Sequence, residues 1–187
     1  MEEDINLQIE MTEELMNDSI EHLQKELLKL RTGKASTAMF NGLMVEYYGS
    51  PTPLNQVANV STSDSRTLVI QPWEKSMLAP IERSIFEANL GLTPQNDGEI
   101  VRITIPPLTE ERRKQLVKKG KALGEDAKVS IRNARRDAME AIKKGVKDGY
   151  PEDAGKRKED DVQKMTNKYS DKVDAVIVAK EKDIMTI

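Results

Sequence analysis

Three long segments of this sequence each carry one stripe of apolar side chains at intervals of three and four residues, the pattern of an amphipathic helix. The segments are residues 5–30, residues 110–147 and the stretch after Pro151. A helix with one apolar stripe cannot bury it alone, and three such helices bury their stripes most economically against one another. The sequence therefore predicts an antiparallel three-helix bundle in which every apolar stripe is fully used in the contacts between the helices.

The spacing also predicts the core positions of the bundle. The stripes consist of Ile9, Met16, Ile20, Leu23, Leu27 and Leu30 on the first helix, of Leu116, Gly120, Leu123, Ala127, Ile131, Ala134, Ala138 and Ile142 on the second, and of Val162, Met165, Tyr169, Val173, Val176 and Lys180 on the third. Gly120 and Gly124 permit a bend or a close helix contact. His22 lies well off its stripe, so we expect it to face solvent.

The stretch between the first two helices has a different character, with Gly, Pro and β-branched residues and a shorter period. Short strands are predicted at residues 43–48, 56–61, 67–72 and 100–105, separated by turn signals such as Asn96-Asp97-Gly98. One helix is expected between the third and fourth strands. Ser76 would cap it, Gly91 and Pro94 would stop it, and its buried face would consist of Ile81, Ile85 and Ala88.

We therefore expect an α+β, mainly helical protein with two domains. The bundle would comprise residues 1–30 and 107–187, and a small β/α/β domain, residues 31–106, would be inserted into it. The two connections, Arg31-Thr32-Gly33 and Pro106-Pro107, would together form a hinge. Thr109, followed by two glutamates, is typical of a helix start.

The residue types argue against an enzyme. The chain has no Cys and one His, which excludes disulfides, Cys-ligated metals and thiol nucleophiles and leaves little for acid–base chemistry. None of its Gly-Lys pairs has the preceding Gly of a nucleotide-binding loop. The N-terminus is acidic where a secretory signal is basic, and the longest aliphatic run, residues 175–179, cannot span a bilayer. We expect a cytoplasmic protein without cofactor, metal or membrane contact.

Charge is segregated along the chain. The net charge of −3 argues against a nucleic-acid partner, but it averages unlike parts. Residues 1–30 hold 2 basic and 9 acidic side chains, whereas residues 110–147 hold 13 basic and 6 acidic ones. The side of the second helix opposite its stripe is expected to carry Lys114, Lys118, Lys121, Lys128, Arg132, Arg136 and Lys143. For the scattered lysines, an ordinary solvated face and a polyanion-binding face remain equally open.

Arg132, Arg135 and Arg136 favour the polyanion. Arginine supplies planar, permanently charged donors that suit phosphate, and these three lie within two helical turns. Few aromatic side chains are available to stack on bases, so such a patch would bind the backbone of structured RNA and not single-stranded sequence.

These residues also carry a resemblance to the family of bacterial ribosome recycling factors. It extends over nearly the whole chain, in the order of the family. The matching stretches are Leu30-Arg31-Thr32-Gly33-Lys34-Ala35-Ser36, Val45-Glu46-Tyr47-Tyr48-Gly49-Ser50-Pro51-Thr52-Pro53-Leu54, Asp64-Ser65-Arg66-Thr67-Leu68, Leu90-Gly91-Leu92-Thr93-Pro94, Pro106-Pro107-Leu108-Thr109-Glu110-Glu111-Arg112-Arg113, Arg132-Asn133-Ala134-Arg135-Arg136-Asp137-Ala138 and Asp160-Asp161-Val162-Gln163-Lys164.

The resemblance implies a three-helix bundle with an inserted β/α/β domain, L-shaped and similar in outline to tRNA. It implies binding to the post-termination ribosome between the subunits, with the bundle on large-subunit rRNA. With elongation factor G, which hydrolyses the GTP, such a factor splits the ribosome into subunits and frees mRNA and tRNA. We expect it to act as a monomer, with the small domain as a lever.

The resemblance also assigns residues. Arg132, Arg135 and Arg136 are the first candidates for rRNA contacts, and Arg112 and Arg113 are a second group near the hinge. Lys128, on the cationic face of the same helix, is a further candidate for an rRNA contact. Where the family commonly has Arg, this chain has Lys34, which keeps the charge but loses the forked donor. The alternative is a helical adaptor or chaperone that grips a protein partner, and apolar side chains left exposed at the tips of the bundle would distinguish it.

Overall fold

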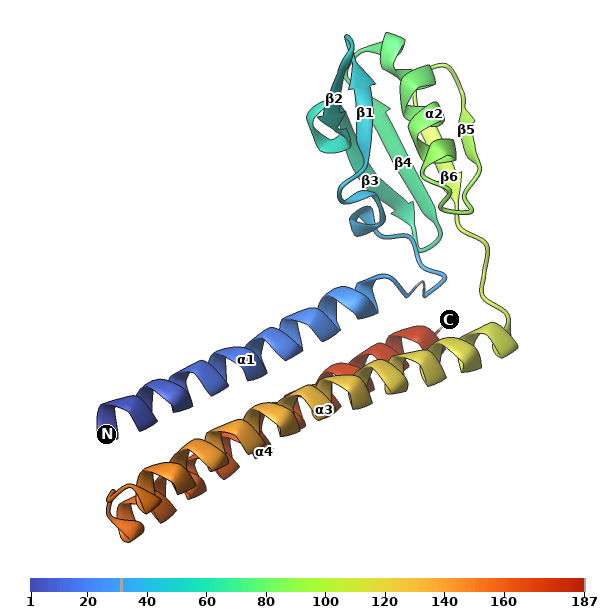
Figure 1. Ribbon diagram of the computed structural model, residues 1–187. Coiled ribbons are helices and arrows are strands. Elements are labelled where there is room, and N and C mark those ends of the chain that lie inside the picture. The colour runs from blue at the N-terminus through green and yellow to red at the C-terminus, as the bar shows by residue number, and fades with distance from the viewer. Residues whose placement is uncertain (31, 187) are drawn as a thin grey trace. The chain divides into compact units, whose positions relative to one another are not determined.

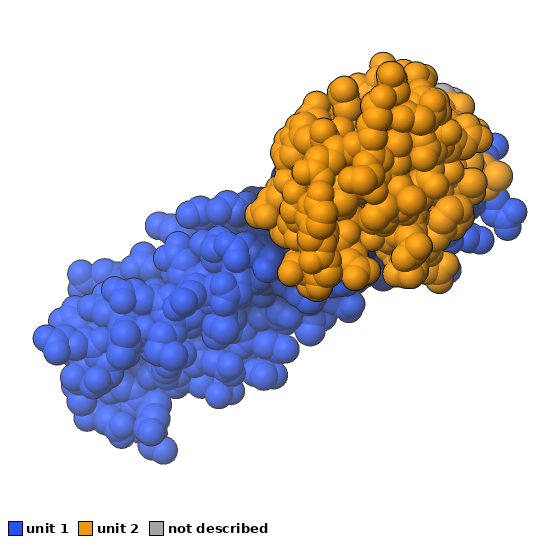
Figure 2. All heavy atoms as spheres, turned by 90° about the horizontal axis from the view of Figure 1, so that it is seen from above, with its two compact units in different colours: residues 1–31, 110–187 blue, residues 32–109 orange. Residues whose placement is uncertain are grey.

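The computed structural model describes residues 1–30 and 32–186, and Figure 1 shows their elements. The helices are α1 (Glu2–Leu28), α2 (Leu78–Glu87), α3 (Glu110–Lys147) and α4 (Glu152–Met185), and the strands are β1 (Met44–Tyr47), β2 (Ser50–Pro53), β3 (Ala58–Asp64), β4 (Thr67–Pro72), β5 (Pro94–Asn96) and β6 (Val101–Thr104). The chain divides into two compact units, residues 1–31 with 110–187 and residues 32–109 (Figure 2).

The first unit is the predicted antiparallel bundle. Each of its three helices packs against the other two, and α3 runs opposite to α1 and α4 (Figure 1). Met16 of α1, Ile131 of α3 and Val162 of α4 are fully buried. The predicted stripes are confirmed as the buried faces, although Ile9, Leu123, Met165, Val176 and Lys180 are only half-buried.

The stripes also contain positions that periodicity missed. Thr12 and Thr166 are buried, and the hydroxyl of each donates to the carbonyl four residues earlier, at 2.8 Å. This local hydrogen bond satisfies the polar atom, so a threonine can occupy a core position. Ile5 and Ile184 extend the core toward the ends of α1 and α4.

The expectation that each helix has one apolar stripe, fully buried by bundling, is wrong for α1. Leu7, Met11 and Leu15 follow one another at intervals of four residues, and each remains at least half exposed, at 56%, 50% and 52%. They lie outside the stripe that faces α3 and α4, because the helix carries a second, shorter row of apolar residues. His22 is exposed, as predicted.

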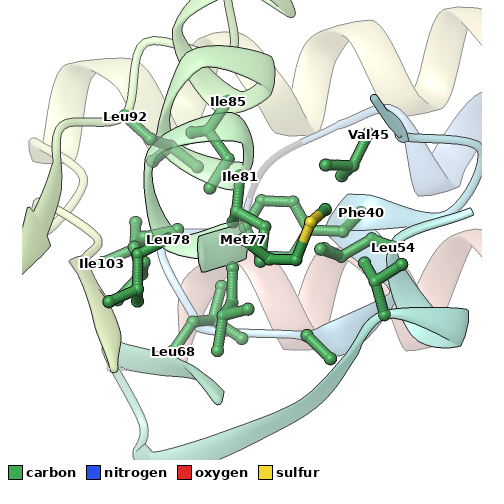
Figure 3. Packing of buried hydrophobic residues seen from close by; sticks show 14 of the residues in the cluster. Phe40, Val45, Leu54, Leu68, Met77, Leu78, Ile81, Ile85, Leu92 and Ile103 are labelled. Carbon is green, nitrogen blue, oxygen red and sulfur yellow. The ribbon is translucent and has the colours of Figure 1, made fainter. Parts of the chain in front are cut away.

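The second unit contains a four-stranded antiparallel sheet in the order β3-β4-β6-β5 and a separate hairpin, β1-β2. Helix α2 packs against β1 and β5. Figure 3 shows the core, in which Ile81 and Ile85 of α2 meet side chains such as Val45 and Leu68. The four predicted strands are confirmed, with ends that differ by up to three residues.

Two further strands contain prolines, which ordinarily disfavour a strand, and the sequence pattern did not predict them. β2 contains Pro51 and Pro53, and β5 begins at Pro94. Among the described residues β2 pairs with β1 alone, and β5 lies at an edge of the sheet. An edge strand tolerates the missing N–H of proline. The predicted turn at Asn96-Asp97-Gly98 is confirmed, since Asn96 Oδ1 accepts from the Gly98 N–H.

The predicted ends of α2 were also wrong. A short 3-10 turn, Lys75–Met77, includes Ser76, so α2 begins at Leu78 without a side-chain cap. Pro80 in the first turn has no N–H, which leaves fewer donors for a cap to satisfy. Ala88 is exposed, because the helix ends at Glu87. Asn89, at φ 51°, and Gly91, at φ 70°, both adopt the left-handed conformation after this end.

Candidate functional site

The cationic face belongs to the central part of α3, a continuous helix of 38 residues. Arg132 and Arg136 are exposed and lie one turn apart on the same face, opposite the buried Ile131, Ala134 and Ala138. The Nε of Arg136 is 3.9 Å from Oδ1 of the adjacent Asp137, a weak and solvated pairing. Both guanidinium groups therefore face water and are available to an anionic partner.

Arg135 lies differently, toward the seam between α3 and α4. It is half-buried, and its Nε donates to Oε1 of Gln163 at 2.8 Å. The amide of Gln163 donates in turn to Oδ1 of Asn167 at 2.9 Å. These hydrogen bonds hold the side chain of Arg135 against α4. Arg135 therefore lies at one edge of the patch formed by Arg132 and Arg136.

Lys128 does not lie on the outward face as predicted. Its side chain is only 26% exposed, and its Nζ lies 2.6 Å from Oδ1 of Asp174 on α4. This hydrogen bond raises the pKa of Lys128, against the opposing effect of burial. The position is turned toward α4 by the geometry of the bundle, which the sequence of α3 alone could not indicate. Its charge is thus paired with a carboxylate at the seam between α3 and α4 and does not stand alone on the outward face.

The other lysines of the predicted face are of two kinds. Lys114 and Lys121 form solvated ion pairs with Glu110 at 3.7 Å and with Glu181 at 3.8 Å. Within residues 1–30 and 32–186, Lys118, Lys143 and Arg132 have no ion-pair partner. The unpaired positive charge on α3 is thus concentrated on fewer side chains than the sequence predicted.

Arg112 and Arg113 form a separate group at the start of α3. They lie about 30 Å from Arg132 along the helix, since each helical residue adds about 1.5 Å. Arg112 donates to Oε1 of Gln115 at 3.2 Å. Arg113 is half-buried, and its buried Nε has no hydrogen-bond partner among the described residues.

The expected hinge segments are both attached to one turn of the small unit. The N–H of Ala35 donates to the carbonyl of Ser65, and the N–H of Ile105 donates to the carbonyl of Arg66, each at 2.7 Å. Sequence reasoning missed this turn between β3 and β4. The anchored backbone thus begins after Lys34 and ends at Ile105.

The segments outside these anchors contain Thr32, Gly33, Pro106 and Pro107 of the expected hinge and also Lys34, Leu108 and Thr109, whereas Arg31 lies outside the described residues. Gly33 has a φ of 75°, and a Cβ there would lie 3.0 Å from Cγ of Leu108. The two connecting segments therefore pass close to each other at Gly33. Pro106 and Pro107 are exposed and belong to no helix or strand.

Comparison with known proteins identifies the family. A model of the ribosome recycling factor family matches residues 23–185. The ribosome-recycling factor of Flavobacterium johnsoniae is 51% identical over 187 residues, covering 100% of both chains, and that of Porphyromonas gingivalis is 52% identical over 173 residues, covering 92% of this chain and 93% of its own. The chain belongs to the ribosome recycling factor family.

Solved structures agree with this membership. The solution structure of a ribosome recycling factor matches this member of the family with a TM-score of 0.82 at 38% identity, covering 98% of each chain. A chain of a second solved structure also matches, from models for the T. thermophilus ribosome recycling factor and the E. coli elongation factor G bound to the E. coli post-termination complex. Its TM-score is 0.65 at 43% identity, and the match covers 97% of this chain and 99% of that chain. Among the described residues, no helix has the length and apolar character needed to cross a membrane.

Proposed function

We propose that this chain, as a ribosome recycling factor, binds the post-termination ribosome and, together with elongation factor G, splits it into subunits. The observation that carries the proposal is the match to a ribosome-recycling factor over all 187 residues at 51% identity. The related factor on the post-termination complex together with elongation factor G supports the choice of partners.

The bundle is the anchor in this proposal. Arg132 and Arg136 offer two exposed guanidinium groups on a rigid helix, and guanidinium binds phosphate oxygens in pairs. A patch of guanidinium groups is suited to the phosphate backbone of folded rRNA. Arg135 would bound this surface, and Arg112 and Arg113 would make a second contact along the same helix. Lys128 contributes less than its sequence position predicted, because Asp174 already binds it.

The small unit is the lever. Its ends are fixed to the turn at Ser65 and Arg66, and the segments beyond these anchors, Thr32 with Gly33 and Pro106 with Pro107, are where the backbone would bend. The factor itself carries out no chemistry in this account. The partner hydrolyses GTP, and the factor acts in the cytoplasm by binding and by movement.

The test is a sedimentation assay on terminated ribosomes. The expected result is that the chain converts them into separate subunits in a sucrose gradient only when elongation factor G and GTP are both present. Intact ribosomes under all conditions, with a folded factor, would contradict the proposal. The matched control replaces GTP by a non-hydrolysable analogue, with which we expect binding without splitting. This control separates ribosome binding by the bundle from movement of the small unit.

A further inference from the structure

The outward face of α1 carries an organised surface that the rRNA-binding patch does not involve. Its centre is the exposed apolar row of Leu7, Met11 and Leu15. Single exposed apolar residues are common on protein surfaces. Three exposed apolar residues at intervals of four, by contrast, form a row of the kind through which a helix contacts another segment.

A row of carboxylates runs beside the apolar row. Glu10, Glu14 and Asp18 follow at the same interval, and each lies three residues after one of the apolar side chains. All three are exposed, and they form no ion pair with any described residue. Like charges at intervals of four residues destabilise a helix, so this row opposes the folding of α1 and nothing within the described residues compensates for it.

The surroundings of this surface, hereafter the α1 face, are acidic as well. Glu3 and Glu21 continue the carboxylate row at either end, and no Lys or Arg occurs before Lys25. The side chains of α1 that reach α4 lie on another face, since Asn6 accepts from Lys158 and Glu13 accepts from Tyr169. The α1 face is therefore not covered by the bundle itself.

The charge of the α1 face decides what can cover it. Phosphate backbones and anionic lipid surfaces repel carboxylates, which excludes rRNA and membranes as occupants. An occupant must combine apolar side chains with positive charge, as a cationic amphipathic segment of a protein does. Proteins that lie among rRNA carry many Lys and Arg side chains to neutralise phosphate, so the ribosome offers such segments.

We propose that the α1 face docks a cationic segment of a ribosomal protein, with Leu7, Met11 and Leu15 as apolar contacts and Glu10, Glu14 and Asp18 as partners for Lys or Arg. This inference rests on the proposed function and deepens it. The bundle would then contact the ribosome through two surfaces of opposite charge, the arginine patch of α3 on rRNA and the α1 face on protein.

Photo-crosslinking from the centre of the α1 face tests the proposal. Met11 is replaced by p-benzoylphenylalanine, and Leu7 by the same group in a second variant, so that the folding of one variant does not decide the result. Each factor is irradiated on purified post-termination ribosomes. The attached segment is identified by mass spectrometry, and rRNA crosslinks by primer extension. The expected product is a ribosomal-protein segment of positive net charge.

Charge variants supply the matched comparison. With Glu10→Gln, Glu14→Gln and Asp18→Asn together, the protein crosslink should fall about fivefold or more, because the charged partners are removed. The control combines Asp160→Asn, Asp161→Asn and Asp171→Asn, three exposed carboxylates of α4, and should leave the yield unchanged. An equal fall in both would overturn the assignment.

Sedimentation of the same samples separates this inference from the proposed function. A factor that sediments with ribosomes but crosslinks to rRNA, to a second copy of itself or to nothing overturns the docking proposal alone. A folded factor that does not sediment with ribosomes at all contradicts the proposed function.

Discussion

Lys128 and Asp174 join α3 to α4 through an ion pair in which Nζ and Oδ1 are 2.6 Å apart. The lysine is mostly buried and the carboxylate is 60% exposed, so water screens the pair in part. A cation that the sequence assigned to the RNA-binding face therefore stabilises the bundle instead.

Replacing the carboxylate should reveal this role. We expect Asp174→Asn to lower the free energy of unfolding by about 0.5 kcal/mol at neutral pH, the magnitude of partly solvated ion pairs, as measured by urea unfolding. The pKa of Lys128 is raised in the folded state by its bond to Asp174, from an ordinary value of 10.5. The stabilisation is therefore fully present below pH 10.5 and is lost as the pH rises through the higher folded value.

The control for this prediction is Asp171→Asn, which removes an exposed carboxylate from the same helix without breaking a pair. Equal stability of the two variants at neutral pH would show that the pair contributes nothing. A difference that persists unchanged above the titration of Lys128 would show that it has another cause.

Two glycines on the buried face of α3 should respond oppositely to alanine. A Cβ at Gly120 would lie 3.7 Å from the nearest side-chain atom, in Leu27, which is ordinary contact. A Cβ at Gly124 would lie 2.7 Å from Cγ1 of Ile177 on α4, and Ile177 would have to move. Gly124 thus permits a close helix contact, one of the two roles that the sequence left open.

We expect Gly120→Ala to raise the free energy of unfolding by up to about 1 kcal/mol, through the better helix propensity of alanine. Gly124→Ala gains the same propensity but overpacks the interface, and we expect the free energy of unfolding to fall by about 1 to 2 kcal/mol. Thermal and urea unfolding of both variants measure the difference. Equal shifts in the same direction would contradict the close approach of α3 and α4 at Gly124.

The hinge can be tested with a reversible crosslink, since the chain has no cysteine of its own. A Cβ at Gly33 would lie against Leu108, so a disulfide between Gly33→Cys and Leu108→Cys would join the two connecting segments. We expect the oxidised form to sediment with ribosomes normally, whereas splitting with elongation factor G and GTP should slow about tenfold because the hinge is restricted. The reduced form is the control. Normal splitting by the oxidised form would rule out the lever.

Periodicity predicted the bundle because helix packing depends mainly on which residues share a face. Met16, Ile131 and Val162 are fully buried for this reason. Leu7, Met11 and Leu15 of α1 also follow at a helical interval, but spacing alone does not show that this second row faces away from α3 and α4. Pro51 and Pro94 concealed two edge strands, since proline is excluded only from strands that are paired on both sides.

The candidate site was predicted less completely, for a related reason. The position of Arg132 on the outward face of α3 follows from the sequence of one helix. The partners of Lys128 and Arg135 lie on α4, and the turn that anchors the hinge lies far along the chain from both Ala35 and Ile105. Such pairings depend on tertiary structure, which the spacing within one segment does not contain.

The central claim is that the cationic face of α3 binds rRNA phosphates, and salt-dependent binding to isolated large subunits tests it most directly. For Arg132→Ala we expect weaker binding and unchanged helical circular dichroism. The slope of log affinity against log salt should be smaller by about 0.7 to 0.9 for each phosphate that the variant no longer neutralises. Arg83→Ala, which removes an exposed arginine from α2, should leave affinity and slope unchanged. Unaltered affinity and slope for Arg132→Ala across the titration would contradict the account.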